Sequence, residues 1–220
     1  MSDGKRPGAV SAFRVPMLLL LLAAGPSAGL AQSAPPPGLP PGVYMGEPDD
    51  KQATAGTYTL DPDHASVIAR VSHLGYSYSI FRFERLSATL AWDPASTAGD
   101  SLSAKVETAS ITSNVKGFGD QLAGDEFLKS KAFPEATFVS TAFRQTSPQS
   151  GKVDGTLSLM GKTRPVTFDV ELVGAGKGFA GQPRMGMTAR TRINPVDFGL
   201  PPLLGEAIEI VVDAEFQRNP

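Results

Sequence analysis

The chain has 220 residues, 41% of them hydrophobic, with 20 basic and 22 acidic side chains and no cysteine. Without cysteine there are no disulfides, no thiolate chemistry and no cysteine-linked lipid. A formal net charge of −2 with no basic stripe argues against nucleic acid or an anionic membrane surface as the main partner.

Residues 1–31 have the layout of a secretory signal peptide. An apolar run over residues 15–24 is followed by small residues and a plausible cleavage point after Ala31. The run is short for a membrane span, although an uncleaved anchor remains the alternative. Three basic residues precede it: Lys5, Arg6 and Arg14. We therefore expect an exported protein, whose charge after cleavage would be about −4.

Residues 32–56 are rich in proline and glycine, which is typical of an extended linker. The remainder, residues 57–218, is predicted to be one domain with a sizeable core.

Apolar and polar side chains alternate throughout this domain, in short runs separated by Gly, Pro, Asp and Asn. A period of two places successive side chains on opposite faces of a strand. Strands are expected over residues 57–60, 66–72, 78–83, 86–92, 102–107, 136–143, 153–160, 165–173, 184–193 and 207–217. Such a series predicts an all-β fold, an antiparallel sheet that shields its dry face by closing into a barrel of about eight strands.

The stretch 114–133 breaks the alternation. Phe118, Leu122, Phe127 and Leu128 have a spacing closer to helical, although nearby glycines weaken it. We expect a short helical insert at one end of the barrel. Its apolar side chains either form the lip of a mouth or bury against the barrel end.

The inward positions mix bulky with small or flexible side chains, so composition leaves open whether the interior is packed or hollow. Those positions include Ala69, Ala104, Phe138, Ala142, Phe168, Met185, Met187, Ala189 and Phe216. Volume decides between the two: a space far larger than the few hundred cubic ångströms of an ordinary pocket would indicate a long-chain guest.

Both histidines have a structural and a functional interpretation. His73 is in phase with Val71 and could face the interior, where it would donate a hydrogen bond to a ligand oxygen, or it could pin the next turn. His64 is expected to organise the turn at Asp61. The two form no tight cluster with Asp63, so we predict no metal site. Neither lies in a nucleophile–base pattern, and we predict no enzyme.

A series of motifs in the same order resembles the YceI family across residues 57–217. It consists of Asp61-Pro62-Asp63-His64-Ala65-Ser66, Val71-Ser72-His73-Leu74-Gly75-Tyr76-Ser77, Arg82-Phe83, Ser110-Ile111-Thr112, Glu126-Phe127-Leu128, Phe133-Pro134-Glu135-Ala136-Thr137-Phe138, Gly155-Thr156-Leu157-Ser158-Leu159, Gly161-Lys162-Thr163-Arg164-Pro165-Val166 and Val196-Asp197-Phe198-Gly199. The resemblance implies a lipocalin-like barrel with an internal tunnel, in a periplasmic protein that binds isoprenoid quinones or polyprenyl phosphates. This chain departs from the family pattern at Phe81 and Ala88, where glycine is common, and at Met160 and Pro195, where histidine and arginine are.

The resemblance leads us to expect a carrier of a long-chain isoprenoid-type lipid, with no required cofactor beyond that bound lipid and no nucleic-acid partner. The positions expected to contact the ligand are Val71, His73, Phe81, Leu122, Phe127, Leu128, Phe138, Phe168, Met187 and Phe198. The alternative is a non-catalytic, stress-linked scaffold that acts through protein–protein contacts. A homodimer is compatible with either function.

Overall fold

The computed structural model describes residues 38, 40, 43–178, 181–205 and 207–220. The predicted signal peptide, residues 1–31, lies outside the described residues, as does the start of the predicted linker. The strands are β1 (Gly56–His73), β2 (Ser77–Phe83), β3 (Leu86–Trp92), β4 (Ser101–Glu107), β5 (Ile111–Ser113), β6 (Glu135–Ser147), β7 (Ser150–Leu159), β8 (Lys162–Lys177), β9 (Pro183–Ile193) and β10 (Ile208–Arg218). The helices are α1 (Phe118–Ala123) and the 3-10 turns η1 (Asp50–Gln52), η2 (Thr97–Gly99), η3 (Thr108–Ser110), η4 (Pro195–Phe198) and η5 (Pro202–Leu204).

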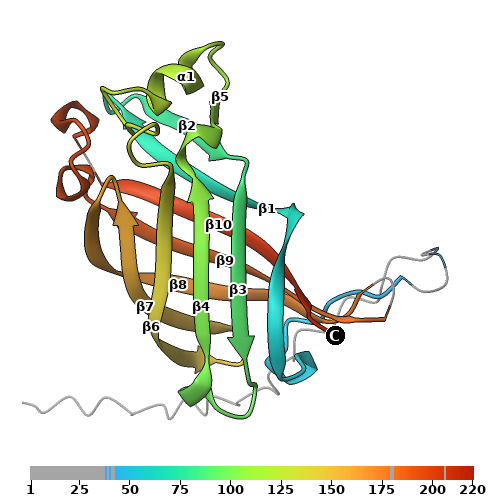
Figure 1. Cartoon of the computed structure of the whole chain (residues 1–220). Helices are drawn as coiled ribbons and strands as arrows, with labels where there is room; N and C mark the ends of the chain where they lie inside the picture. The colour runs from blue at the N-terminus through green and yellow to red at the C-terminus, as the bar shows by residue number, and fades with distance from the viewer. Residues whose placement is uncertain (1–37, 39, 41–42, 179–180, 206) are drawn as a thin grey trace, which may run out of the picture. The chain divides into compact units, whose positions relative to one another are not determined.

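Eight of these strands form a closed ring (Figure 1). Its order is β1, β3, β4, β6, β7, β8, β9 and β10, and pairing of β10 with β1 closes it. Every pair of neighbours is antiparallel. The predicted eight-stranded antiparallel barrel is therefore confirmed. Closure removes the exposed sheet edges of an open sheet.

β1 is a single bent strand, whereas the sequence suggested two strands separated by Asp61-Pro62. Its register against β10 shifts between Leu60 and Ala65, so the turn residues form a bulge inside the strand. The Asp61 carboxylate holds the bulge, because it accepts the backbone N–H of Asp63 at 3.2 Å and lies 3.1 Å from the Nδ1 atom of His64. β3 pairs with β1 before the bulge and β2 pairs with it after the bulge.

One end of the barrel, which we call the α1 end, carries α1, β2 and β5 (Figure 1). β5, a strand that the sequence pattern missed, pairs with β2, and α1 packs against β5. α1 lies in the predicted insert. Gly119 is required there, since a Cβ atom at this position would lie 2.6 Å from the carbonyl oxygen of Ile111. The opposite end, which we call the η2 end, carries the β3–β4 and β6–β7 turns.

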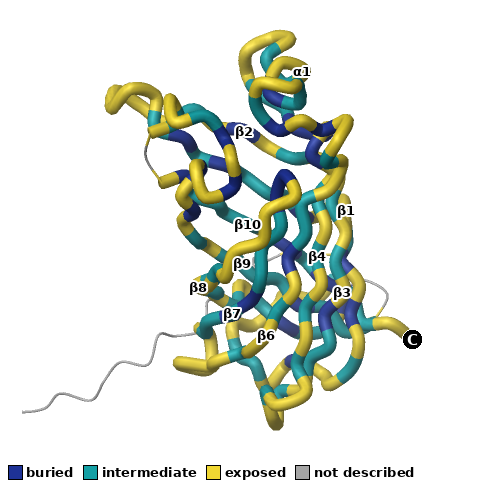
Figure 2. The backbone as a smooth tube through the Cα atoms, turned by 60° about the vertical axis from the view of Figure 1, so that its left-hand side comes forward, coloured by how far each residue is buried: buried dark blue, intermediate teal, exposed yellow. Residues whose placement is uncertain are grey.

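The described part of the predicted linker contacts the barrel. Glu47 forms a backbone bridge with Ala175, Ala53 is buried, and the Tyr58 hydroxyl donates to the Thr54 carbonyl oxygen at 2.5 Å. On β4 and along most of β8, less exposed and more exposed residues alternate as the period of two requires (Figure 2).

Candidate functional site

A long apolar cavity of about 320 Å³ lies inside the barrel. On β10 its walls include every second residue: Ile208, Ile210, Val212, Ala214 and Phe216. At about 3.3 Å per residue this run is about 26 Å long, and a strand tilt of about 40° makes it roughly 20 Å along the barrel axis. The volume is spread over that length, so the cavity is narrow and suits an extended guest.

The volume itself falls within the range of an ordinary small-molecule pocket. It is not the far larger space that would by itself have indicated a long-chain guest. The interior is nevertheless hollow, and the packed-core alternative is wrong. Small side chains on β1, β3, β4 and β9 leave this room: Ala69, Ala88, Ala104 and Ala189 all line the cavity.

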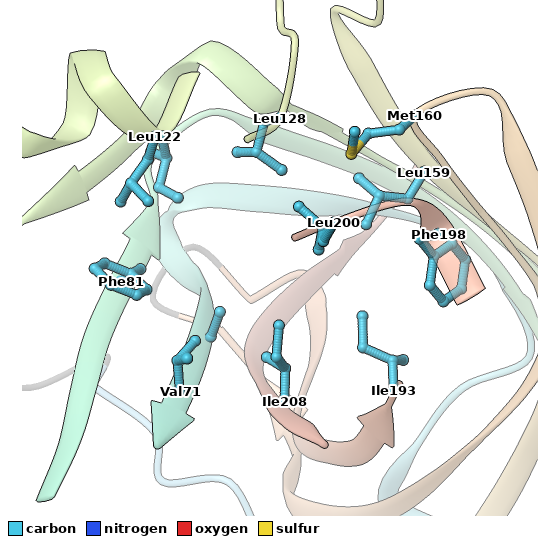
Figure 3. Close-up of a cluster of buried hydrophobic side chains, with 12 residues drawn as sticks. Val71, Phe81, Leu122, Leu128, Leu159, Met160, Ile193, Phe198, Leu200 and Ile208 are labelled. Atoms are coloured by element: carbon cyan, nitrogen blue, oxygen red, sulfur yellow. The ribbon is translucent and has the colours of Figure 1, made fainter. Parts of the chain in front are cut away.

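The α1 end of the cavity is closed by apolar side chains from separate elements (Figure 3). Leu122 of α1 and Leu128, both 6% exposed, face Leu200 and Ile208 across the space, and all four line it. The insert thus buries its apolar residues against the barrel end and in doing so forms the end wall.

Aromatic rings set the shape of the middle of the cavity. Phe138 and Phe168 line it and meet edge to face, with ring centroids 5.1 Å apart. Such pairs contribute about 0.5–1.5 kcal/mol beyond burial. The Phe138 ring rests on Gly155, where a Cβ atom would lie only 2.4 Å from it. Glycine here lets the ring lie flat against the wall.

The η2 end of the cavity is the polar end. Trp92 lines it, with its ring against Phe143 at a centroid distance of 6.5 Å. The polar residues that also line this end are Asp50, Thr97, Gln145, Ser147, Gln149 and Ser150. The Gln145 amide donates a hydrogen bond to the Asp50 carboxylate. An amphiphile in this cavity would therefore find apolar walls along most of its length and polar groups at one end.

Eight of the ten residues expected to contact a ligand line the cavity: Val71, Phe81, Leu122, Phe127, Leu128, Phe138, Phe168 and Met187. The expectation that His73 faces the interior is wrong. β10 pairs with β1 only as far as Arg70, so the last residues of β1 pair with β2 alone and extend past the ring. His73 is accordingly exposed. Phe198 is 2% exposed in the core near the α1 end, but it does not line the cavity.

Trp92 lines the cavity and was not among the positions expected to contact a ligand. The alternation of β3 could have predicted this position, because Trp92 is in phase with the inward residues Ala88 and Leu90. The described residues contain no group of three or more His, Asp or Glu side chains placed to hold a metal ion. No helix in the described part of the chain has the length and apolar character needed to cross a membrane.

A closed antiparallel barrel of eight strands around a narrow apolar cavity defines the class of small β-barrels that enclose one elongated ligand. The family model for the YceI-like domain matches residues 58–216, and the chain belongs to the YceI family. A UPF0312 protein of Pseudomonas putida strain W619 is 36% identical over 168 residues, which are 74% of this chain and 88% of that protein.

Two solved structures share the fold. BcnA of Burkholderia cenocepacia matches with a TM-score of 0.62 at 24% identity, over 73% of this chain and 99% of that one. A polyisoprenoid binding domain from Saccharophagus degradans matches with a TM-score of 0.55 at 14% identity, over 76% of this chain and 100% of that one.

Proposed function

We propose that the protein is an exported, non-catalytic carrier of a long-chain isoprenoid-type amphiphilic lipid, of the quinone or polyprenyl phosphate class. The observation that carries this proposal is the shape and lining of the cavity: its walls are apolar along most of its length, and it is drawn out along the barrel. A compact polar metabolite would leave most of these walls without a partner, whereas an extended hydrocarbon chain contacts them along its whole length.

Binding is non-covalent and driven by the hydrophobic effect. Each CH₂ group that leaves water for the apolar walls contributes about 0.8 kcal/mol, and the ordering of the chain offsets part of this gain. The polar head stays at the end of the cavity where polar side chains gather. Chain length and shape then determine specificity more than the head does.

Membership of the YceI family supports this proposal, as does the shared fold with a Saccharophagus degradans domain described as polyisoprenoid binding. Most of the wall is aliphatic and aromatic, which suits non-covalent binding of a hydrocarbon chain. Periplasmic location is part of the proposal and rests on the signal-like sequence of residues 1–31.

Native mass spectrometry of protein purified from a quinone-containing host tests the proposal directly. We expect a co-purifying lipid, which organic extraction removes and re-addition restores with saturable binding. If the extracted and refolded barrel binds neither isoprenoid quinones nor polyprenyl phosphates saturably, the carrier function is refuted.

A further inference from the structure

The indole N–H of Trp92 is buried, and its Nε1 atom has no hydrogen-bond partner among the described residues. A buried donor left unpaired loses its hydrogen bonds to water and gains nothing in return, so buried indole N–H groups nearly always have a partner. Trp92 also lines the cavity, at its η2 end. A guest in the cavity can therefore supply the missing acceptor.

Asp100 also has a buried polar atom without a hydrogen-bond partner among the described residues. It lies one position beyond the paired part of the β3–β4 ladder. The ladder ends at Ala91 and Ser101, so Trp92 and Asp100 follow it on opposite strands. One carboxylate oxygen of Asp100 accepts the backbone N–H of Asp93 at 2.9 Å, while the other is buried and has no partner in the described part of the chain. Burial raises the pKa of Asp100 above its ordinary value. Two of the four buried side-chain atoms that lack a partner among the described residues therefore lie at this end.

The charges around the cavity disfavour an anionic head group. Three cationic residues contribute to the lining, and each has a carboxylate partner: Lys105 with Glu135 at 3.3 Å, Arg144 with Asp154 at 2.7 Å, and Lys152 with Asp169. Asp50 lines the same end and Asp100 lies beside it, so a phosphate would meet carboxylates, and the cations of the described lining are already paired with carboxylates. An uncharged oxygen needs only the indole donor.

We propose that Trp92 is the head-group donor of this cavity: its Nε1–H binds an uncharged acceptor oxygen, such as a quinone carbonyl, and the apolar chain extends toward the α1 end. This inference rests on the proposed carrier function and narrows its two lipid classes to one. It also fixes the direction in which the lipid lies. The polar lining at the η2 end and the leucine wall at the α1 end both agree with that orientation.

The test compares three probes of matched isoprenoid chain length: a quinone, a hydrocarbon without oxygen, and a polyprenyl phosphate. Each is titrated into delipidated wild-type protein and into the Trp92→Phe variant, with bound lipid measured by native mass spectrometry. Trp92→Phe keeps an aromatic ring against Phe143 and removes the donor together with part of the ring surface, and the hydrocarbon probe measures the effect of that lost surface by itself. Loss of one hydrogen bond predicts about tenfold weaker quinone binding, with hydrocarbon binding changed less than about twofold. The wild type should bind the phosphate more weakly than the quinone.

Phe143→Leu is the matched control, since it alters the packing of the indole ring and keeps its N–H. It should change quinone and hydrocarbon binding by the same factor. Trp92 is the only tryptophan in the chain, so its emission reports the head position, and a bound quinone should quench it far more than the hydrocarbon does. Equal weakening of quinone and hydrocarbon by Trp92→Phe, or tighter binding of the phosphate, would overturn the inference. Failure of all three probes to bind wild-type protein would instead refute the carrier function.

Discussion

A large side chain substituted at a small residue of the cavity wall should abolish lipid binding without unfolding the barrel. Ala88, on β3, lines the cavity and pairs directly with another small wall residue, Ala104 of β4. In an Ala88→Phe variant, the new ring would project from this thin part of the wall into the open space. The change therefore tests whether the hollow that the structure shows is also present in solution.

The expected magnitudes differ clearly between a hollow and a filled interior. Inserting a large side chain into a packed core costs about 1–3 kcal/mol or more. In a hollow core the ring gains contacts, and burial of a Phe side chain contributes about 2 kcal/mol, so the free energy of unfolding should stay level or rise. If the ring displaces about four CH₂ groups of the guest, lipid binding loses about 3 kcal/mol, which is more than a hundredfold in the dissociation constant.

Urea denaturation and lipid titration of the delipidated protein provide the two measurements. Ala91→Phe is the matched control, because Ala91 lies on the same strand but does not line the cavity. It should leave lipid affinity unchanged. A destabilisation of 2 kcal/mol or more by Ala88→Phe, with lipid affinity retained, would show that the interior is packed and that lipid binds elsewhere.

Three further predictions concern individual side chains. Phe81→Ala removes a ring that packs on Phe118 at a centroid distance of 6.0 Å and should lower the free energy of unfolding by about 3 kcal/mol; a loss below 1 kcal/mol in urea denaturation would contradict that packing. The hydrogen bond from Arg144 is the main cause that brings the pKa of Asp154 to about 2 from 3.8. Asp154 therefore contributes stability that is complete above pH 3.8 and is lost as the pH falls toward 2. Asp154→Asn should flatten the pH dependence of the free energy of unfolding between these two pH values, and an unchanged slope would refute this. His73→Ala should change stability by less than about 0.5 kcal/mol and leave lipid affinity unaltered, because the side chain is exposed; a tenfold weaker affinity would return His73 to the site.

The barrel could be predicted from sequence because its signal is local. Period-two alternation, as in Ile208–Arg218, reports which face of a strand is dry, and the number of such runs indicates closure. The bulge in β1 could not be predicted, since Asp61-Pro62 is typical of a chain turn. One contact that ties these residues to the sheet comes from far along the chain, since Arg184 of β9 lies 2.8 Å from the Asp61 carboxylate.

The site could be predicted only in part, for a reason visible in His73. Alternation assigns a residue to a face, but whether that face encloses the cavity depends on how far the neighbouring strands extend. β10 stops pairing with β1 at Arg70, so Val71 still lines the cavity while His73, two residues further on, lies past the enclosing wall. Cavity volume is equally non-local, because it depends on which side chains meet from opposite sides of the ring. The types of residue in the wall could therefore be predicted from sequence, whereas the volume of the cavity between them could not.

The hollow lowers the stability of the fold, and a purely structural protein would gain nothing in return. An apolar wall that faces empty space lacks the contacts that filling side chains would supply, so an unoccupied hollow lowers the stability of a fold relative to a filled interior. Larger side chains at Ala69, Ala104 or Ala189 would fill the space by simple substitution. A sequence that keeps alanine at these positions, while its ring strands are otherwise regular, is better explained by a guest that occupies the space than by the needs of folding.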